Sequence, residues 1–317
     1  MTIRIAIVGF GKIACDEHLP AIAADARFGL TAVVTRGTDP AIGVPCFESL
    51  AAMLDAIPGQ VDAVAICTPP SVRGAIAREA IAAGIGVLLE KPPAATLGEA
   101  AELGQIARAA GVPLYASWHS QHSPGVAKAA QALAGEELAS LRISWREDVR
   151  KFHPGQQWIW RAGGFGVFDA GINALSIAVR IVPAPLLVAE AALHIPRNVQ
   201  TPIAATVRFA GKDSVAEFDW RADCDADWRI SVQSVRGREV TLSQGGATLS
   251  IDGQQQVLSG IHGYPSIYDR FAAVVAAQAI DLNLEPLRIV SDVFLVGHRH
   301  IIEEFDDGIL GNDRDRV

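Results

Sequence analysis

Cysteine is scarce in this chain of 317 residues, which contains only four. They are Cys15, Cys46, Cys67 and Cys224, and no two of them show the CxxC spacing of a redox or metal motif. Four scattered cysteines are too few for a disulfide framework. The N-terminus also lacks the basic segment and the cleavage site of a secretion signal. We therefore expect free thiols in a cytoplasmic protein.

Long apolar runs and basic clusters are missing as well. No apolar run approaches the roughly 18 residues that a membrane-spanning helix needs, so we expect no membrane partner. The formal net charge is -8 without a local Lys/Arg cluster, which argues against binding to nucleic acid. Half of the residues are apolar and 20% are charged, a composition that predicts a globular protein with a substantial core.

Short apolar runs alternate with helical patterns through the first third of the sequence. The runs are IRIAIVGF, LTAVVT, VDAVAIC and GVLLE, and PLYAS ends the series at Ser117. Such alternation is typical of a parallel sheet wrapped by crossover helices, and runs without polar alternation suit strands buried on both faces. The sequence therefore predicts an α/β fold with an N-terminal Rossmann domain over residues 1–120.

A different pattern occupies residues 121–317. Runs such as LRISWRE, AEFDWRA and RISVQSV alternate apolar and polar residues, as half-exposed antiparallel strands do. Three glycine links predict hairpin turns, at Arg236-Gly237, Gly245-Gly246 and Asp252-Gly253. Helical patterns return at 266–277 and 285–305, where the chain can come back to the first domain. We expect an α+β domain on a largely antiparallel open sheet, whose apolar outer face pairs copies into a dimer or tetramer.

A glycine turn directly follows the first strand-like run. Gly9, Gly11 and Ala14 form a G-x-G-x-x-A pattern that opens a helical segment, which is the setting of a dinucleotide-binding turn. The first glycine permits the tight turn, and the second lets the backbone at Gly11, Lys12 and Ile13 approach a pyrophosphate. The alternative is an ordinary strand-to-helix turn, but the strand and helix repeats that follow favour a cofactor site.

The end of the second strand bears on which dinucleotide is bound. Thr35 and Arg36 stand there without the acid that an NAD site places on the ribose 2'-hydroxyl. Arg36 can pair with the 2'-phosphate of NADP, so we expect both NADP and NAD as cofactors, with NADP preferred. If Arg36 is only a solvated loop residue, the preference is slight. Cys67, Thr68 and Pro69 close the fourth strand and are expected beside the same cofactor.

Glu90 and Lys91 close the fifth strand, at the carboxyl edge where open α/β sheets bind ligands. The sequence Glu90-Lys91-Pro92 and the N-terminal glycine turn resemble the Gfo/Idh/MocA family of NAD(P)-dependent oxidoreductases, over essentially the whole chain. Within that family the runs EKPPAATLGE, SWHS, WREDVRKFHPGQQWIW and GVFDAGINALSI are similar to bacterial aldose 1-dehydrogenases. The resemblance implies oxidation of the anomeric carbon of a galactose-configured pyranose (D-galactose, L-arabinose or D-fucose) to its lactone.

Lys91 and Asp169 are the expected catalytic residues. The C1 hydroxyl must lose a proton as its hydride leaves, so the site needs a base or a cation beside the oxygen. Lys91 can serve as either, and it is also expected at the cofactor together with Glu90; the alternative is a surface lysine paired with Glu90. Asn173 lies four residues after Asp169, where much of the family has a histidine. Because an amide cannot relay a proton, Asn173 is expected to bind sugar or nicotinamide.

The implied sugar pocket lies between Trp118 and Asn173. The resemblance favours four further contacts with the sugar, namely His119, Glu147, His153 and Trp158. A structural role is the alternative for each of them, since a single histidine is more often part of the core than a ligand. No metal is expected, because hydride transfer to a nicotinamide needs none. Two other functions stay open: a dehydrogenase of another polyol or cyclic sugar, and a non-catalytic regulator that binds dinucleotide or sugar.

Overall fold

The computed structural model describes residues 2–37, 39–211, 213–221 and 226–306, so Cys224 lies outside the described residues. The chain divides into two compact units. The first contains residues up to 122 together with 261–284, and the second contains 123–260 together with the chain from 285 onward. The first unit is therefore built from two stretches that are far apart in the sequence.

The first unit contains a seven-stranded sheet in the order β15-β6-β5-β4-β1-β2-β3. Its strands are β1 (Ile3–Val8), β2 (Phe28–Val34), β3 (Cys46–Phe47), β4 (Ala63–Ile66), β5 (Gly86–Glu90), β6 (Leu114–Ser117) and β15 (Ile280–Asp281). All pairings between these strands are parallel. The order reverses at β1, which pairs with β2 on one side and β4 on the other. Open α/β sheets bind ligands at the carboxyl ends of strands at such a reversal.

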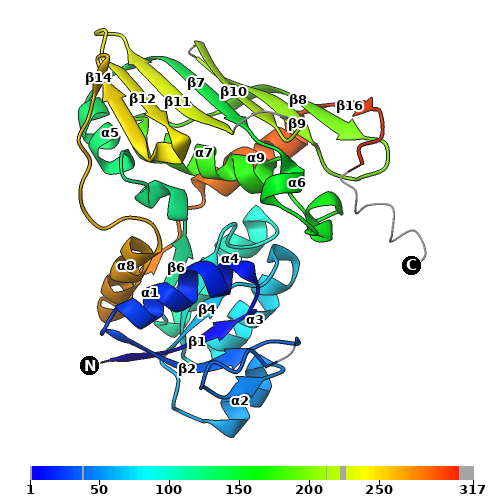
Figure 1. Ribbon diagram of the computed structural model, residues 1–317, viewed down its shortest axis with the longest axis vertical. Helices are drawn as coiled ribbons and strands as arrows, with labels where there is room; N and C mark the ends of the chain where they lie inside the picture. The colour runs from blue at the N-terminus through cyan, green and yellow to red at the C-terminus, as the bar shows by residue number, and fades with distance from the viewer. Residues whose placement is uncertain (1, 38, 212, 222–225, 307–317) are drawn as a thin grey trace. The chain divides into compact units, whose positions relative to one another are not determined.

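Helices connect these strands (Figure 1). They are α1 (Leu19–Ala24), α2 (Leu50–Ala56), α3 (Pro70–Ala82), α4 (Leu97–Ala110) and α8 (Tyr264–Ala276), with a 3-10 turn η2 (His119–His122). Ser49 caps α2 and Thr96 caps α4, each by accepting a backbone N–H three residues on. A π-helical turn, η1 (Ala14–His18), precedes α1 and ends at the fully buried His18. Residues of α8, including Tyr268 and Phe271, share one buried cluster with Ile5 and Phe28 of the sheet.

The second unit contains a nine-stranded sheet in the order β14-β13-β12-β11-β7-β10-β9-β8-β16. Its strands are β7 (Leu138–Arg146), β8 (Val188–Pro196), β9 (Ala204–Phe209), β10 (Asp213–Asp219), β11 (Asp227–Ser234), β12 (Glu239–Ser243), β13 (Thr248–Ile251), β14 (Gln254–Gln255) and β16 (His298–Ile302). Only β7 with β10 and β8 with β16 pair in parallel, which confirms the largely antiparallel sheet. The three glycine links join neighbouring antiparallel strands, and Gly237, Gly246 and Gly253 have positive φ there, as hairpin turns require.

Figure 1 shows the longer helices of this unit on one face of its sheet. The helices are α5 (Val126–Leu133), α6 (Val149–Phe152), α7 (Phe168–Ile181) and α9 (Glu285–Val296), with 3-10 turns η3 (Gln157–Trp160) and η4 (Gln244–Gly246). α7 contacts both α5 and α9. Gly171 permits close packing, because a Cβ there would lie 2.7 Å from the Phe218 ring of β10.

Two expectations about this unit were wrong. The helix expected over 285–305 ends at Val296, and after Gly297 the chain forms β16, which pairs with β8. The outer face of the sheet is polar rather than apolar. Along β7, buried Leu141 and Ile143 alternate with Arg142 and Arg146, which form ion pairs with acidic residues of β10.

Candidate active site

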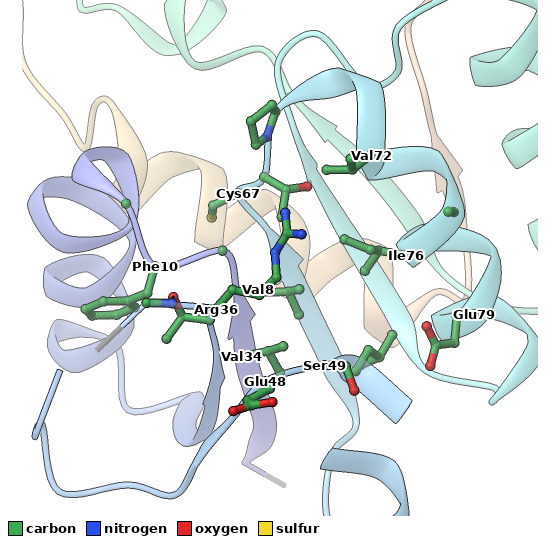
Figure 2. Close-up of a pocket in the computed structure, with 18 residues that line it drawn as sticks. Val8, Phe10, Val34, Arg36, Glu48, Ser49, Cys67, Val72, Ile76 and Glu79 are labelled. Atoms are coloured by element: carbon green, nitrogen blue, oxygen red, sulfur yellow. The ribbon is translucent and has the colours of Figure 1, made fainter. Parts of the chain in front are cut away.

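A cavity of about 590 Å³ opens in the first unit at the carboxyl ends of β1, β2 and β4 (Figure 2). Seven of the residues predicted to bind cofactor line it: Gly9, Gly11, Thr35, Arg36, Cys67, Thr68 and Pro69. The other four predicted cofactor residues, Lys12, Ile13, Glu90 and Lys91, do not line it. The cavity thus gathers the glycine turn and the ends of two further strands, as the sequence pattern predicts.

The glycine turn is tightly packed on one side and open on the other. A Cβ on Gly9 would lie 2.8 Å from Thr68 Cγ2 and 2.9 Å from the Thr68 backbone nitrogen, so only glycine fits there. A Cβ on Gly11 would meet no atom within 4 Å. The Thr68 hydroxyl is buried and has no hydrogen-bond partner among the described residues. A pyrophosphate suits this site, because it would fill the space beside Gly11 and bring oxygen acceptors to the turn.

Arg36 supplies the positive charge of the cavity. Its side chain is exposed and reaches into the cavity in Figure 2. The exposed Glu48, which follows β3, lines the same cavity and was missed by the sequence analysis. β3 pairs in parallel with β2, so residues that follow the two strands reach the same edge of the sheet. The cavity therefore offers both a guanidinium and a carboxylate to a ribose.

Lys91 follows β5 and is half-buried. The Lys91–Pro92 bond is cis, and the Lys91 backbone N–H donates to Oε2 of Glu90 at 3.0 Å. The Glu90 side chain is buried, and its Oε1 accepts hydrogen bonds from Ser117 and Tyr264, both at 2.8 Å. Glu90 is thus turned into the interior of the unit. The ring of His119, one of the predicted sugar contacts, stacks on that of Tyr264, with 5.8 Å between the ring centroids.

His153 lies between two carboxylates in the second unit. Its Nε2 is 2.9 Å from Glu147 Oε1, and its Nδ1 is 3.6 Å from Asp169 Oδ2. Glu147 also accepts from the indole N–H of Trp220 at 3.1 Å and of Trp228 at 2.8 Å. The fold therefore brings together three predicted site residues, Glu147, His153 and Asp169, which come from the end of β7, the end of α6 and the start of α7.

Asn173 and Trp158 occupy nearby stretches of the same unit. Asn173 is half-buried one turn after Asp169 on α7, and Trp158 is half-buried in η3. No hydrogen bond joins their side chains to Glu147 or His153 in the described part of the chain. Trp220 and Trp228 were missed by the sequence analysis because only the pairing of distant strands brings them to Glu147. The sequence contained one hint of their role: they are the two tryptophans that lie outside the 118–173 stretch.

The described residues hold no group of three or more His, Cys, Asp or Glu side chains arranged to bind a metal ion. They also contain no helix that is both long and apolar enough to cross a membrane.

Comparison with known proteins assigns the family. Residues 3–117 match the Gfo/Idh/MocA profile, described as an oxidoreductase family with an NAD-binding Rossmann fold. A curated relative, galactose 1-dehydrogenase of Pseudomonas fluorescens, is 45% identical over 308 residues, which are 96% of this chain and 99% of the relative. The chain belongs to the Gfo/Idh/MocA oxidoreductase family. It is an NAD(P)-dependent oxidoreductase, and its first unit is the Rossmann domain of that family.

Two solved structures have the same architecture as this chain. D-galactose-1-dehydrogenase from Rhizobium etli matches with a TM-score of 0.90 and 46% identity, over 96% of this chain and 98% of that chain. KijD10, a 3-ketoreductase from Actinomadura kijaniata solved with NADP and TDP-benzene, matches with a TM-score of 0.82 and 20% identity, over 95% of this chain and 100% of that one. At that identity the likeness to KijD10 shows the shared fold.

Proposed function

We propose that this chain is an aldose 1-dehydrogenase that oxidises C1 of a galactose-configured pyranose to the lactone. The observation that carries the proposal is the similarity to two proteins named as galactose 1-dehydrogenases, at 45% and 46% identity over 96% of the chain. D-Galactose, L-arabinose and D-fucose are the proposed substrates, because they share the arrangement of ring hydroxyls.

The reaction removes a hydride from C1 and a proton from the C1 hydroxyl, which leaves a C1 carbonyl. When bound, NADP or NAD supplies the hydride acceptor, at C4 of its nicotinamide. Lys91 and Asp169 are the proposed groups for the proton. As an amine, Lys91 accepts the proton; as an ammonium, it stabilises negative charge on the oxygen, and Asp169 is the acceptor. The hydrogen bond from the Lys91 N–H to the Glu90 carboxylate holds the backbone from which this side chain extends.

His153 is the proposed hydrogen-bond acceptor for a sugar hydroxyl. The Glu147 carboxylate accepts hydrogen bonds from both indole N–H groups. Because a carboxylate only accepts, Nε2 of His153 carries the proton and donates to it. In the neutral ring Nδ1 is then an acceptor, and this buried atom has no hydrogen-bond partner among the described residues. A hydroxyl that donates to Nδ1 would also lie near Asp169. In this arrangement Glu147 orients His153, Asn173 offers its amide to the sugar, and Trp158 offers an aromatic face to it.

The residues at the cavity in the first unit suit both dinucleotides. Arg36 can pair with the 2'-phosphate of NADP, and Glu48 can accept a hydrogen bond from the 2'-hydroxyl of NAD. Because a guanidinium binds a phosphate through two charged hydrogen bonds, NADP is the proposed preference. Thr35, Cys67, Thr68 and Pro69 would line the bound cofactor.

We also propose that the protein acts in the cytoplasm as a homo-oligomer of two or four chains. Cys15, Cys46 and Cys67 are free thiols, as a reducing compartment allows. One face of the nine-stranded sheet has no helix on it in Figure 1, and such a face is available to a second copy. Light scattering would give twice or four times the chain mass of 33.5 kDa, and a mass of one chain would contradict the assembly.

The function is tested by following the absorbance of reduced nicotinamide with purified protein. NAD and NADP are each offered with D-galactose, L-arabinose, D-fucose, D-glucose, D-xylose and myo-inositol. The proposal predicts reduction with the first three sugars and formation of a lactone. Reduction with myo-inositol alone would assign a polyol dehydrogenase. Dinucleotide binding without turnover of any sugar would favour a regulator, and both outcomes would overturn the proposal.

A further inference from the structure

A buried polar cluster surrounds the Glu90 side chain, and its other members have no part in the proposed chemistry. His18 is the first member: its Nε2 is 3.2 Å from Glu90 Oε1, and its Nδ1 is 2.8 Å from the Tyr268 hydroxyl. The His18 side chain is fully buried and that of Glu90 is 4% exposed. Ser117 and Tyr264 donate to the same Glu90 oxygen as His18. Three donors therefore converge on Oε1, while Oε2 accepts the Lys91 N–H.

The surroundings favour the charged forms of both Glu90 and His18. Burial alone would raise the pKa of Glu90, but the hydrogen bond and charge of His18 outweigh it and hold that pKa well below its ordinary value. Burial alone would lower the pKa of His18, and Cys67, Tyr268 and Glu90 raise it well above its ordinary value. Burial raises the pKa of Tyr268 to about 12, so this hydroxyl stays neutral. Together with the 3.2 Å contact between His18 Nε2 and Glu90 Oε1, these directions favour an ion pair inside the unit.

A second buried cation, Arg73 of α3, holds the same turn from its other side. Its Nη1 donates to the carbonyl oxygens of Glu90 and Pro92, which flank Lys91, and its Nη2 donates to the Thr68 carbonyl. The Arg73 side chain is buried. One guanidinium therefore ties the lysine turn to Thr68, which lines the cofactor cavity.

We infer that His18, Glu90 and Arg73 are positioning residues that fix the backbone of Lys91, with His18 acting through Glu90. The N–H of Lys91 is held by Glu90, and the carbonyls on both sides of it are held by Arg73. His18 reaches Glu90 from the end of the π-helical turn η1, and single π turns inside helices often mark functional positions. The inference rests on the proposed function only in naming Lys91 as the group to be positioned.

The geometry explains why a charged partner is used. A buried carboxylate is costly even with the hydrogen bonds from Ser117, Tyr264 and the Lys91 N–H. Loss of the charge on His18 therefore favours rotation of Glu90 toward solvent or uptake of a proton. Either change weakens its hold on the Lys91 N–H. A reacting group misplaced by about 1 Å can lose on the order of a hundredfold in rate. We therefore expect loss of the His18 charge to act on Lys91 and its turn.

Amide hydrogen exchange at Lys91 tests the inference without any turnover. In His18→Gln, which removes the positive charge, exchange of this amide should rise by about tenfold or more. The matched control is Tyr268→Phe, which removes the other partner of His18 and leaves the His18–Glu90 pair in place. In the control, exchange at Lys91 should stay within about threefold of the wild type, even where thermal stability falls. Equal exchange in the wild type and His18→Gln would overturn the inference.

Kinetics give the second readout. His18→Gln should lower kcat by about 10- to 100-fold, while KM for sugar and Kd for the dinucleotide change by less than about threefold. Tyr264→Phe, which removes one hydroxyl bond to Glu90, is the milder variant if His18→Gln fails to fold, and it should lower kcat by a smaller factor. A fall in kcat matched by an equal loss of dinucleotide binding would indicate general disruption and would contradict the inference.

The two hypotheses fail in different ways. If wild-type protein reduces no cofactor with any sugar, the proposed function fails, and the amide exchange of Lys91 still decides whether His18 positions this turn. If wild-type protein oxidises D-galactose while His18→Gln keeps both its kcat and its slow exchange, the proposed function stands and the positioning role is excluded.

Discussion

At the scale of single residues, the most informative position is Asn173. It lies one turn after Asp169, where the family resemblance implies a histidine, so the sequence alone places no imidazole at that point. The structure brings His153 to Asp169 from a different segment, with Nδ1 3.6 Å from the carboxylate. Residue spacing cannot reveal this contact, because it depends on how the loop after β7 folds back toward α7.

Lys91 offers the most direct mutational test of the chemistry. Lys91→Ala removes the proposed base or cation, so kcat should fall by about 10² to 10⁴ fold, the usual range for a general acid-base group. Dinucleotide affinity should stay within a few fold, because Lys91 does not line the cavity in the first unit. Steady-state kinetics and fluorescence titration with NADP measure the two quantities. Turnover close to that of the wild type would remove Lys91 from this role.

Arg36 sets the expected preference between dinucleotides. Arg36→Ala should raise KM for NADP by about 10- to 100-fold, since a charge-assisted hydrogen bond to phosphate contributes roughly 1.5–3 kcal/mol. KM for NAD should change little, because NAD carries no 2'-phosphate. Arg108→Ala is a control, since Arg108 is an exposed arginine of α4 that does not line the cavity. An equal change for both cofactors would contradict the assignment.

The His18–Glu90 pair predicts how stability depends on pH. The raised pKa of His18 means that its contribution is complete below its ordinary value of 6.5 and is lost as pH rises through the folded value. The lowered pKa of Glu90 means that its contribution is complete above 4.5 and is lost as pH falls through the folded value. The difference in unfolding free energy between wild type and His18→Gln should therefore be largest between pH 4.5 and pH 6.5. Urea unfolding at several pH values measures it.

Above pH 6.5 that difference should shrink by up to about 1.4 kcal/mol per pH unit. Tyr268→Phe keeps the ion pair, so its stability should follow the wild-type pH dependence more closely than that of His18→Gln. A difference that stays constant or grows toward alkaline pH would show that His18 is neutral in the folded protein.

At the scale of elements, the prediction succeeded where the pattern is local and failed where it is not. Unbroken apolar runs such as Ala63–Ile66 identify strands buried on both faces, and the glycine links mark hairpins in the second sheet. β15 has two residues and gains its place only by pairing with β6. β16 has two apolar residues among five and gains its place by pairing with β8. No local pattern marks it as a strand, so the preceding helix was predicted to continue to residue 305.

Helix α7 carries Asp169 and Asn173, and its packing predicts a second variant. Gly171→Ala would place a Cβ 2.7 Å from the Phe218 ring, and overpacking of this kind costs about 1–3 kcal/mol. The thermal unfolding midpoint should fall accordingly. Gly98→Ala in α4 is the matched control, because a Cβ there meets no atom within 4 Å and alanine favours a helix. A stable Gly171→Ala protein would show that the sheet and α7 can separate at little cost.

At the scale of the whole molecule, composition and the alternation of apolar runs with helical patterns predicted an α/β protein with a Rossmann domain and a second, mostly antiparallel domain. The sequence indicated that the chain can come back to the first domain at 266–277 and 285–305. It could not show which of the two stretches joins the first unit, since that depends on tertiary packing of residues such as Tyr268 and Phe271. It also predicted Glu147, His153 and Asp169 as site residues and missed the indoles of Trp220 and Trp228. Such contacts form only when strands distant in sequence pair.

The central claim is that C1 of the sugar is the oxidised carbon, and isotope transfer tests it most directly. D-Galactose deuterated at C1 is incubated with the protein and the oxidised cofactor, and the reduced cofactor is analysed by mass spectrometry. The account predicts one deuterium in the reduced nicotinamide and a slower rate than with unlabelled sugar. A reduced cofactor without deuterium would show that hydride comes from another carbon and would contradict the account.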